Sequence, residues 1–217
     1  MPIRHLAAAA MLSCAIASAH AAQAPTEQQV NAFFRAVQMD DASTVRKMVG
    51  AVVNANELNP LGGEPALVLA VREGSREVLR ELLRHPGTDL ERKALNGNTA
   101  LMMAAFKRDE DAARALVERG ASINQPGWTA LHYAAASGDD KIALLLIERG
   151  ARLDAVSPRP SGAMTPLMMA VREGHDATAR LLVAKGAKTG LRNTEGLTAA
   201  HIAQKAGRDE LARELAK

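Results

Sequence analysis

The chain has one cysteine and very few aromatic side chains. Cys14, the single cysteine among 217 residues, lies in an apolar stretch at the N-terminus. If that stretch is removed from the mature protein, neither a disulfide nor a catalytic thiol remains. One tryptophan, one tyrosine and three phenylalanines make up the whole aromatic content, 2% of the chain. An aromatic residue on the surface of this protein is therefore rare enough to be informative.

Signatures of bound ligands are also missing. The 27 basic and 24 acidic residues are interspersed, and no basic run with interleaved aromatics indicates nucleic-acid binding. The sequence contains no glycine-rich phosphate loop before a helix, no nucleophile motif and no histidine pair at metal-ligand spacing. We therefore expect no catalytic residue, no metal and no cofactor, and an enzyme or a metal carrier is the disfavoured class.

The first 22 residues have the features of a secretory signal peptide. Arg4 gives a positive start, residues 6–19 form a short apolar stretch, and Ala19-His20-Ala21 is a small-residue cleavage site. The apolar stretch is too short to span a bilayer, and no other stretch is long and apolar enough. An uncleaved anchor and a lipoprotein modified at Cys14 are the alternatives. We expect residues 1–22 to be removed and the mature chain, residues 23–217, to be periplasmic or secreted.

A short motif recurs at a nearly fixed interval along the rest of the chain. In its full form it reads Thr-x-Leu followed three residues later by alanine. Five copies begin 34, 30, 36 and 33 residues apart, at Pro65, Thr99, Thr129, Thr165 and Thr198. A period near 33 residues indicates a stacked array of small structural units.

Each complete copy is followed by a second apolar run. These runs, such as residues 142–147, place apolar residues on one face of a helix. Glycines such as Gly138 and Gly174 separate the two predicted helices of a unit, since glycine adopts positive φ without a Cβ clash. No unit can bury its apolar faces alone, so neighbouring units must stack. The sequence predicts an all-α solenoid of stacked helix–turn–helix units.

The repeat resembles the ankyrin repeat family. Residues 127–135, Gly-Trp-Thr-Ala-Leu-His-Tyr-Ala-Ala, are similar to the family pattern Gly-x-Thr-Pro-Leu-His-x-Ala-Ala, and Gly174-His175 and residues 181–187 match the second helix. The resemblance covers roughly residues 27–217 and implies one ankyrin repeat domain over residues 23–217, with about six units joined by short hairpin loops. It implies an N-terminal capping repeat at 27–60, internal repeats at 61–93, 94–124, 125–157 and 158–192, and a C-terminal capping repeat at 193–217.

Several motif positions depart from the family pattern. Pro65 replaces the first threonine, so that unit loses a hydroxyl cap. His132 and His201 keep the histidine whose imidazole, in this family, bonds near the preceding turn, whereas Met102 and Met168 replace it. The two Leu-Met-Met-Ala motifs lie two units apart, roughly 20 Å at about 10 Å per unit. They cannot share one copper ion, so we interpret these methionines as core residues.

Two connecting loops also depart from the pattern. The loop between Ile123 and Gly127 is short, which predicts a truncated hairpin. The loop between Asp154 and Thr165 is long and contains Pro158 and Pro160. We expect its residues 157–162 to be a stiff, exposed segment without regular structure.

The resemblance places a concave groove along the hairpin tips and the first helices of the units. Trp128 and Phe106 fall at nominally exposed groove positions of adjacent units, and Met164 would extend this apolar patch. The charged rim of the groove would consist of Arg72, Lys107, Arg172 and Glu173. Trp128 has an alternative, because the shortened hairpin before it lets the ring fold onto the stack as a core residue.

The resemblance implies a protein-binding module that recognises a partner protein through this groove. We expect a monomer that binds neither nucleic acid nor a membrane. Similarity to exported bacterial ankyrin proteins suggests a periplasmic or secreted enzyme as the partner, which the protein would protect, assist or inhibit. An immunity-type inhibitor of a toxin is the narrower version. A passive scaffold or self-assembling array is the alternative, although a scaffold has no need of exposed aromatic residues.

Overall fold

The computed structural model describes residues 24–217, and the predicted signal peptide lies outside this part. Residues 24–217 form twelve α-helices in six antiparallel pairs and no β-strand, which confirms the predicted all-α solenoid. The pairs are α1 (Glu27–Gln38) with α2 (Ala42–Met48), α3 (Ala66–Glu73) with α4 (Arg76–Arg84), α5 (Ala100–Lys107) with α6 (Glu110–Glu118), α7 (Ala130–Ser137) with α8 (Asp140–Glu148), α9 (Pro166–Glu173) with α10 (Asp176–Ala184), and α11 (Ala199–Lys205) with α12 (Asp209–Leu215).

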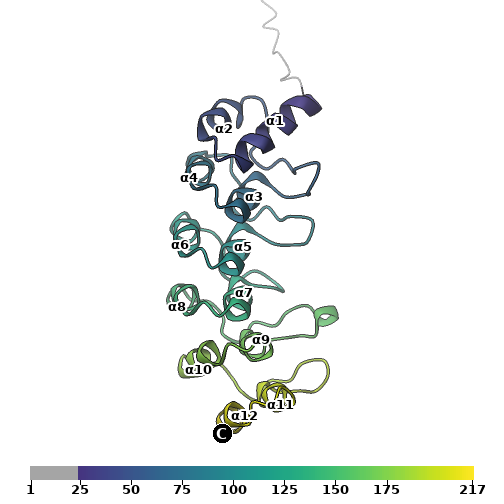
Figure 1. The fold of residues 1–217 in the computed structure, drawn as a ribbon, viewed down its shortest axis with the longest axis vertical. Helices are drawn as coiled ribbons and strands as arrows, with labels where there is room; N and C mark the ends of the chain where they lie inside the picture. Colours follow the sequence, from purple (N-terminus) through teal and green to yellow (C-terminus); the bar gives the residue numbers. More distant parts are fainter. Residues whose placement is uncertain (1–23) are drawn as a thin grey trace, which may run out of the picture.

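The pairs stack in chain order, so that the molecule is a single elongated array (Figure 1). From α3 onward, the odd-numbered helices form one column and the even-numbered helices a second column beside it. The connecting loops project from the side of the odd-numbered helices. We call the odd-numbered helices the inner helices and the even-numbered helices the outer helices. One face of the array is therefore lined by the loops and the inner helices, and the opposite face is formed by the outer helices.

The start of each inner helix is set by the first residue of the repeat motif. The hydroxyls of Thr99 and Thr165 accept hydrogen bonds from the backbone N–H groups of Met102 and Met168, at 3.3 and 3.2 Å. Such a cap satisfies one of the N–H groups that the first turn of a helix leaves unpaired. Pro65 stands at the same position of α3 and makes no side-chain cap, as the sequence predicted.

One continuous core runs through all the units. The motif leucines of the internal repeats are at most 2% exposed, and the core cluster extends without a break from Val30 to Leu215. The motif methionines are also buried, Met102 at 2% and Met168 at 1% exposure, which confirms their predicted role as core residues. Each unit is therefore stabilised by its neighbours and not by a core of its own.

Ion pairs connect successive outer helices along the opposite face. They join α2 to α4, α4 to α6, α6 to α8, and α10 to α12, through Arg46–Glu81, Arg76–Asp111, Lys141–Glu110 and Arg180–Glu214 at 2.7–3.3 Å. Because these pairs are mostly exposed, each adds little stability. These charges of the outer helices are therefore paired with one another within the protein.

The turn between the two helices of each unit contains a residue in the left-handed conformation, with positive φ, which favours glycine. At Gly138 a close contact gives a second reason for glycine. Its φ is 69°, and a Cβ at this position would lie 2.4 Å from Nδ1 of His175 in the next unit. Gly174, with φ of 88°, has no atom within 4 Å of the same position. Arg108 takes this conformation in the third unit, with φ of 58°, although the sequence has no glycine there.

Gly138→Ala is therefore expected to destabilise the protein more than Gly174→Ala. Both variants carry the cost of a left-handed alanine, about 1 kcal/mol, but only the first pushes a methyl group into the imidazole of His175. Urea unfolding of the two variants measures the difference. Equal midpoints would show that His175 moves aside without cost.

The loop before α9 differs from its prediction. Residues 157–162 contain a short 3₁₀ helix, η1 (Arg159–Ser161), and are not free of regular structure. Ser157 is only 3% exposed, and its hydroxyl accepts a hydrogen bond from the backbone N–H of Met164 at 2.9 Å. The two ends of the loop are therefore joined at its base, because Ser157 N–H also donates to the Met164 carbonyl at 2.9 Å.

Candidate functional site

Three aromatic side chains form a row on the loop-lined face, and we call them the aromatic cluster: Phe106, Tyr133 and Trp128. Phe106 lies near the end of α5, Tyr133 lies in α7, and Trp128 lies in the loop before α7. The Phe106 and Tyr133 rings meet edge to face at a centroid distance of 6.4 Å, and Tyr133 and Trp128 are tilted at 6.1 Å. Three of the five aromatic residues of the chain therefore gather at the junction of two units.

The three rings differ in how much of them is open to a partner. Phe106 is 58% exposed, which makes it one of the few large apolar side chains on the surface of the described residues. Tyr133 and Trp128 are half-buried and pack against the core. The Tyr133 hydroxyl donates to Oδ1 of Asn98 at 2.6 Å, so its polar end is satisfied within the protein.

Trp128 combines features of the two alternatives that the sequence left open. Its ring is neither fully exposed nor a core residue, because one edge packs on the His132 imidazole at 5.2 Å while part of the ring remains accessible. Tyr133, which links Trp128 to Phe106, was not among the residues predicted from the sequence. The available signal was its place as the only tyrosine, at the variable position of the best-matched motif.

His132 is a buried residue that contacts the aromatic cluster through Trp128. It is fully buried, its Nδ1 accepts a hydrogen bond from the Thr129 N–H at 3.2 Å, and its Nε2 lies 3.0 Å from the Met164 carbonyl oxygen in the next unit. Because Nδ1 accepts, Nε2 carries the proton and donates to Met164. Burial lowers the pKa of His132 from 6.5 to about 4. The predicted structural role of this imidazole is confirmed.

This pKa shift predicts a pH-dependent stability. The folded pKa of His132 lies below its unfolded value, so the unfolded state binds the proton first as the pH falls. The stabilisation is therefore complete above pH 6.5 and is lost progressively down to pH 4. Between pH 7 and pH 6 we expect a loss on the order of 1 kcal/mol, measured by urea unfolding.

His132→Gln is the control for this prediction. Glutamine at the same helix position closes the capping box of α1, where the Thr26 N–H donates to Gln29 Oε1 at 2.8 Å. The variant keeps a side-chain acceptor but cannot titrate, so its stability must change less between pH 7 and pH 6. An unchanged pH dependence would assign the effect to other groups.

Met164 does not extend the apolar surface as expected. Its side chain is only 4% exposed, and its backbone is held by Ser157 and His132. Met164 therefore offers a partner little side-chain surface, although it is among the residues that line a shallow hollow beside α9 and α11. Its sulfur lies 3.7 Å from Nδ2 of Asn193, in the loop before α11.

The residues of the predicted rim lie at the ends of the inner helices. Arg72 contacts Glu64 and Glu73 at 3.1 and 2.9 Å. Arg172 contacts Glu173, also at 2.9 Å, and both of these residues are exposed. Lys107 is exposed beside Phe106. Two of the three rim cations are thus neutralised within the protein, and Lys107 is the one that adjoins the aromatic cluster in sequence.

A shallow hollow of about 240 Å³ shows that the loop-lined face is concave near the rim. Loop residues line one side, and residues of α9 and α11 line the other, among them Ser161, Asn193, Arg172, Ile202 and Lys205. At this junction the surface is therefore hollowed between the loops and the inner helices.

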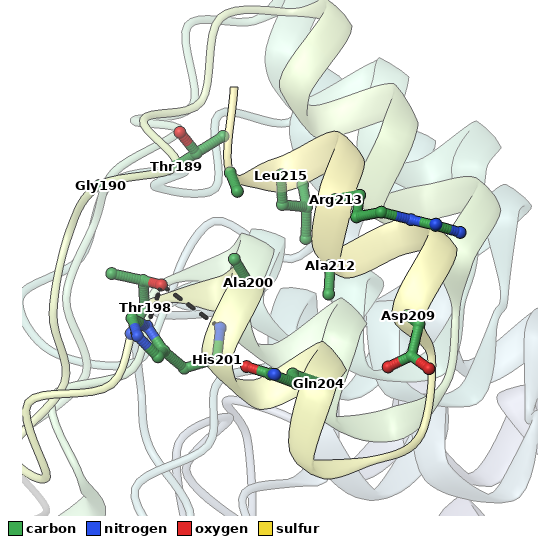
Figure 2. Close-up of a pocket in the computed structure, with 11 residues that line it drawn as sticks. Thr189, Gly190, Thr198, Ala200, His201, Gln204, Asp209, Ala212, Arg213 and Leu215 are labelled. Atoms are coloured by element: carbon green, nitrogen blue, oxygen red, sulfur yellow. Dashed lines mark hydrogen bonds between the residues drawn. The ribbon is translucent and has the colours of Figure 1, made fainter.

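A larger hollow of about 660 Å³ lies on the outer side of α11 and α12 (Figure 2). Thr198 and His201 line it, with Thr198 Oγ1 2.6 Å from Nδ1 of His201, beside Gln204 and Arg213. In earlier units the corresponding face is covered by the next helix pair, and there His132 is buried, whereas His201 is exposed. This hollow therefore lies on the face that corresponds to the stacking face of the earlier units.

Residues 24–217 contain neither a cluster of metal-ligating side chains nor a helix that could span a membrane. No three His, Cys, Asp or Glu side chains in this range converge as metal ligands. None of the helices in the same range is both long and apolar enough to cross a bilayer.

The repeats match a known family. A family model described as ankyrin repeats, in three copies, matches residues 33–126, 67–157 and 157–217. These matches extend over most of the chain and include every residue of the aromatic cluster. Proteins built from ankyrin repeats are typically non-enzymatic modules for protein–protein interaction. The chain belongs to the ankyrin repeat family.

Proposed function

We propose that the protein is an exported binding module that holds a partner protein in its groove, with the aromatic cluster as the central anchor. The observation that carries this proposal is the clustering of three of only five aromatic residues at the junction of two units, with Phe106 58% exposed. Buried contacts of tryptophan and tyrosine dominate the energy of many protein interfaces. A stacking role alone does not explain the exposure of Phe106.

The distribution of charged residues supports the same face as the binding surface. Charges on the outer helices are used in pairs between units, whereas Lys107 and the exposed Arg172–Glu173 pair border the groove. Rim charges of this kind mainly set the orientation and the rate of association. We therefore assign Phe106, Tyr133 and Trp128 to affinity, and Lys107, Arg72, Arg172 and Glu173 to steering.

The N-terminal sequence supports a partner outside the cytoplasm. A positive start, a short apolar stretch and an Ala-x-Ala site favour export. Similarity to exported bacterial ankyrin proteins favours a periplasmic or secreted enzyme that the module protects, assists or inhibits. A passive scaffold is the second candidate, but only the binding role uses the exposed ring of Phe106.

Affinity capture with a matched pair of variants tests the proposed function. Phe106→Asp and Met39→Asp each replace an exposed apolar side chain, 58% and 75% accessible, but Met39 lies at the end of α1 in the first unit, two units away from Phe106. We expect the wild type and Met39→Asp to retain the same partner from an extract of the native cells, and Phe106→Asp to lose it. Equal capture by all three proteins would move the binding surface away from the aromatic cluster.

Export gives a separate prediction. The native protein is expected to begin near residue 22 or 23, because signal peptidase cleaves after a small-residue site such as Ala19-His20-Ala21. Mass spectrometry of the intact native chain, after cell fractionation, measures its N-terminus and its compartment. An intact Met1 in the cytoplasmic fraction would contradict export without affecting the binding site.

A further inference from the structure

His132 links three parts of the structure that meet beneath the aromatic cluster. Its Nδ1 accepts from the Thr129 N–H at the first turn of α7, and its Nε2 lies 3.0 Å from the Met164 carbonyl of the next unit. Its ring and the Trp128 ring meet in an edge-to-face arrangement at a centroid distance of 5.2 Å. A change at this one imidazole therefore alters contacts with three groups: the first turn of α7, the loop before α9 and the indole of Trp128.

We propose that His132 is an acid-sensitive latch for the aromatic cluster: a proton taken up at Nδ1 opens the first turn of α7 and releases Trp128 from its half-buried position. The inference rests on the proposed function in one respect only, namely that the position of Trp128 controls the affinity for a partner. The conformational change itself belongs to the chain alone and can be measured without a partner.

The hydrogen bonds define what protonation changes. Neutral His132 uses Nδ1 as an acceptor, and a protonated Nδ1 becomes a donor that faces the Thr129 N–H, another donor, at 3.2 Å. The hydroxyl oxygen of Thr129, 2.9 Å away, is then the acceptor that remains at this turn. The backbone of Thr129 must rotate so that its N–H no longer points at the ring, and Trp128 is the residue directly before it.

The environment keeps the imidazole neutral at ordinary pH without help from a charged group. Burial is the main cause of the low pKa of His132, and the remaining causes are hydrogen bonds to backbone groups of Met164 and Ala155, which raise it. Tyr133, its neighbour on α7, titrates only at high pH, because burial raises its pKa further. Charged residues on the elements packed around α7 do not contribute to the shift: Lys107 on α5, Asp140, Lys141 and Glu148 on α8, Arg172 and Glu173 on α9, and Arg152, Asp154 and Arg159 in the loop before α9.

The other units show that this arrangement is particular to one position. Met102 and Met168 occupy the matching sites of α5 and α9, and neither can titrate. His201 closes the same capping box at the start of α11 but is exposed, and the residue before its threonine is Leu197. His132 is thus the one motif histidine within residues 24–217 that is both buried and in ring contact with a tryptophan.

Tryptophan emission tests the latch directly, since Trp128 is the only tryptophan of the chain. The purified protein is titrated from pH 7 downward while the emission maximum and the far-ultraviolet circular dichroism are recorded. We expect a red shift of the emission that is half-complete near pH 4, with the helical signal retained through the transition. The His201→Gln variant should behave like the wild type.

Two variants of His132 serve as controls that the chain itself suggests. His132→Gln copies the capping box of Thr26 and Gln29, and His132→Met copies the residues at the matching sites of α5 and α9. Both are expected to lose the emission transition. The proposal is overturned if either folded variant keeps it, if the wild-type emission does not change down to pH 4, or if the helical signal is lost together with the emission shift. Failure of the latch leaves the capture experiment at neutral pH unaffected, so the two hypotheses fail separately.

Discussion

Replacing Leu131 with alanine is expected to lower the unfolding free energy by about 2–5 kcal/mol, the usual cost of removing a large buried side chain. Leu131 is 0% exposed and lies in α7, which packs against both α5 and α9. The cavity would therefore open between three consecutive units. We expect the loss to appear as a lower midpoint in urea, together with weaker cooperativity.

Leu215→Ala provides the comparison, because burial alone does not distinguish the two sites. Leu215 is 3% exposed, but it lies at the end of α12, in the last helix pair of the array. In a stacked array, stability depends on the interfaces between neighbours, and a central defect weakens two interfaces whereas a terminal one weakens only one. The Leu131 variant should therefore have the lower midpoint. Equal midpoints for the two variants would contradict coupling between nearest neighbours.

Most of the fold could be predicted from the sequence because each unit repeats the same local signals. Thr99 and Thr165 mark helix starts through their hydroxyl caps, and the motif leucines mark the core. Local deviations were not predictable in the same way. Asp40 and Arg108 take a left-handed conformation where the other four units have glycine, because the neighbouring helices fix the turn and the residue must accept it.

The candidate site was predictable only in part, because repeat alignment gives a position along the groove and not the direction of a side chain. Phe106 lies where the alignment placed it and is exposed. Met164 occupies an aligned position too, but its side chain is only 4% exposed. Tyr133 was missed because its contact with both Phe106 and Trp128 depends on how α5 and α7 pack.

Trp128→Ala is expected to weaken partner binding by roughly thirtyfold, which corresponds to about 2 kcal/mol for an interface anchor. The half-buried position of the ring adds a second effect. Because one edge of the indole packs on His132 and another contacts Tyr133, its removal also leaves part of the stack uncovered. We therefore expect a moderate fall in the melting temperature of this variant, in addition to the loss of affinity.

Phe106→Ala separates the contribution of the groove surface from that of the fold. Phe106 is 58% exposed and contacts the cluster through one edge-to-face pair, so its removal should weaken binding and leave the melting temperature nearly unchanged. Calorimetric titration of the captured partner with both variants, alongside thermal unfolding of each free protein, gives the two quantities. If Trp128→Ala loses stability while Phe106→Ala binds like the wild type, the aromatic cluster is part of the stack and the partner contacts another surface, for which the exposed η1 loop is the next candidate. If both variants lose affinity and only Trp128→Ala loses stability, the indole serves the fold with one edge and the partner with the other.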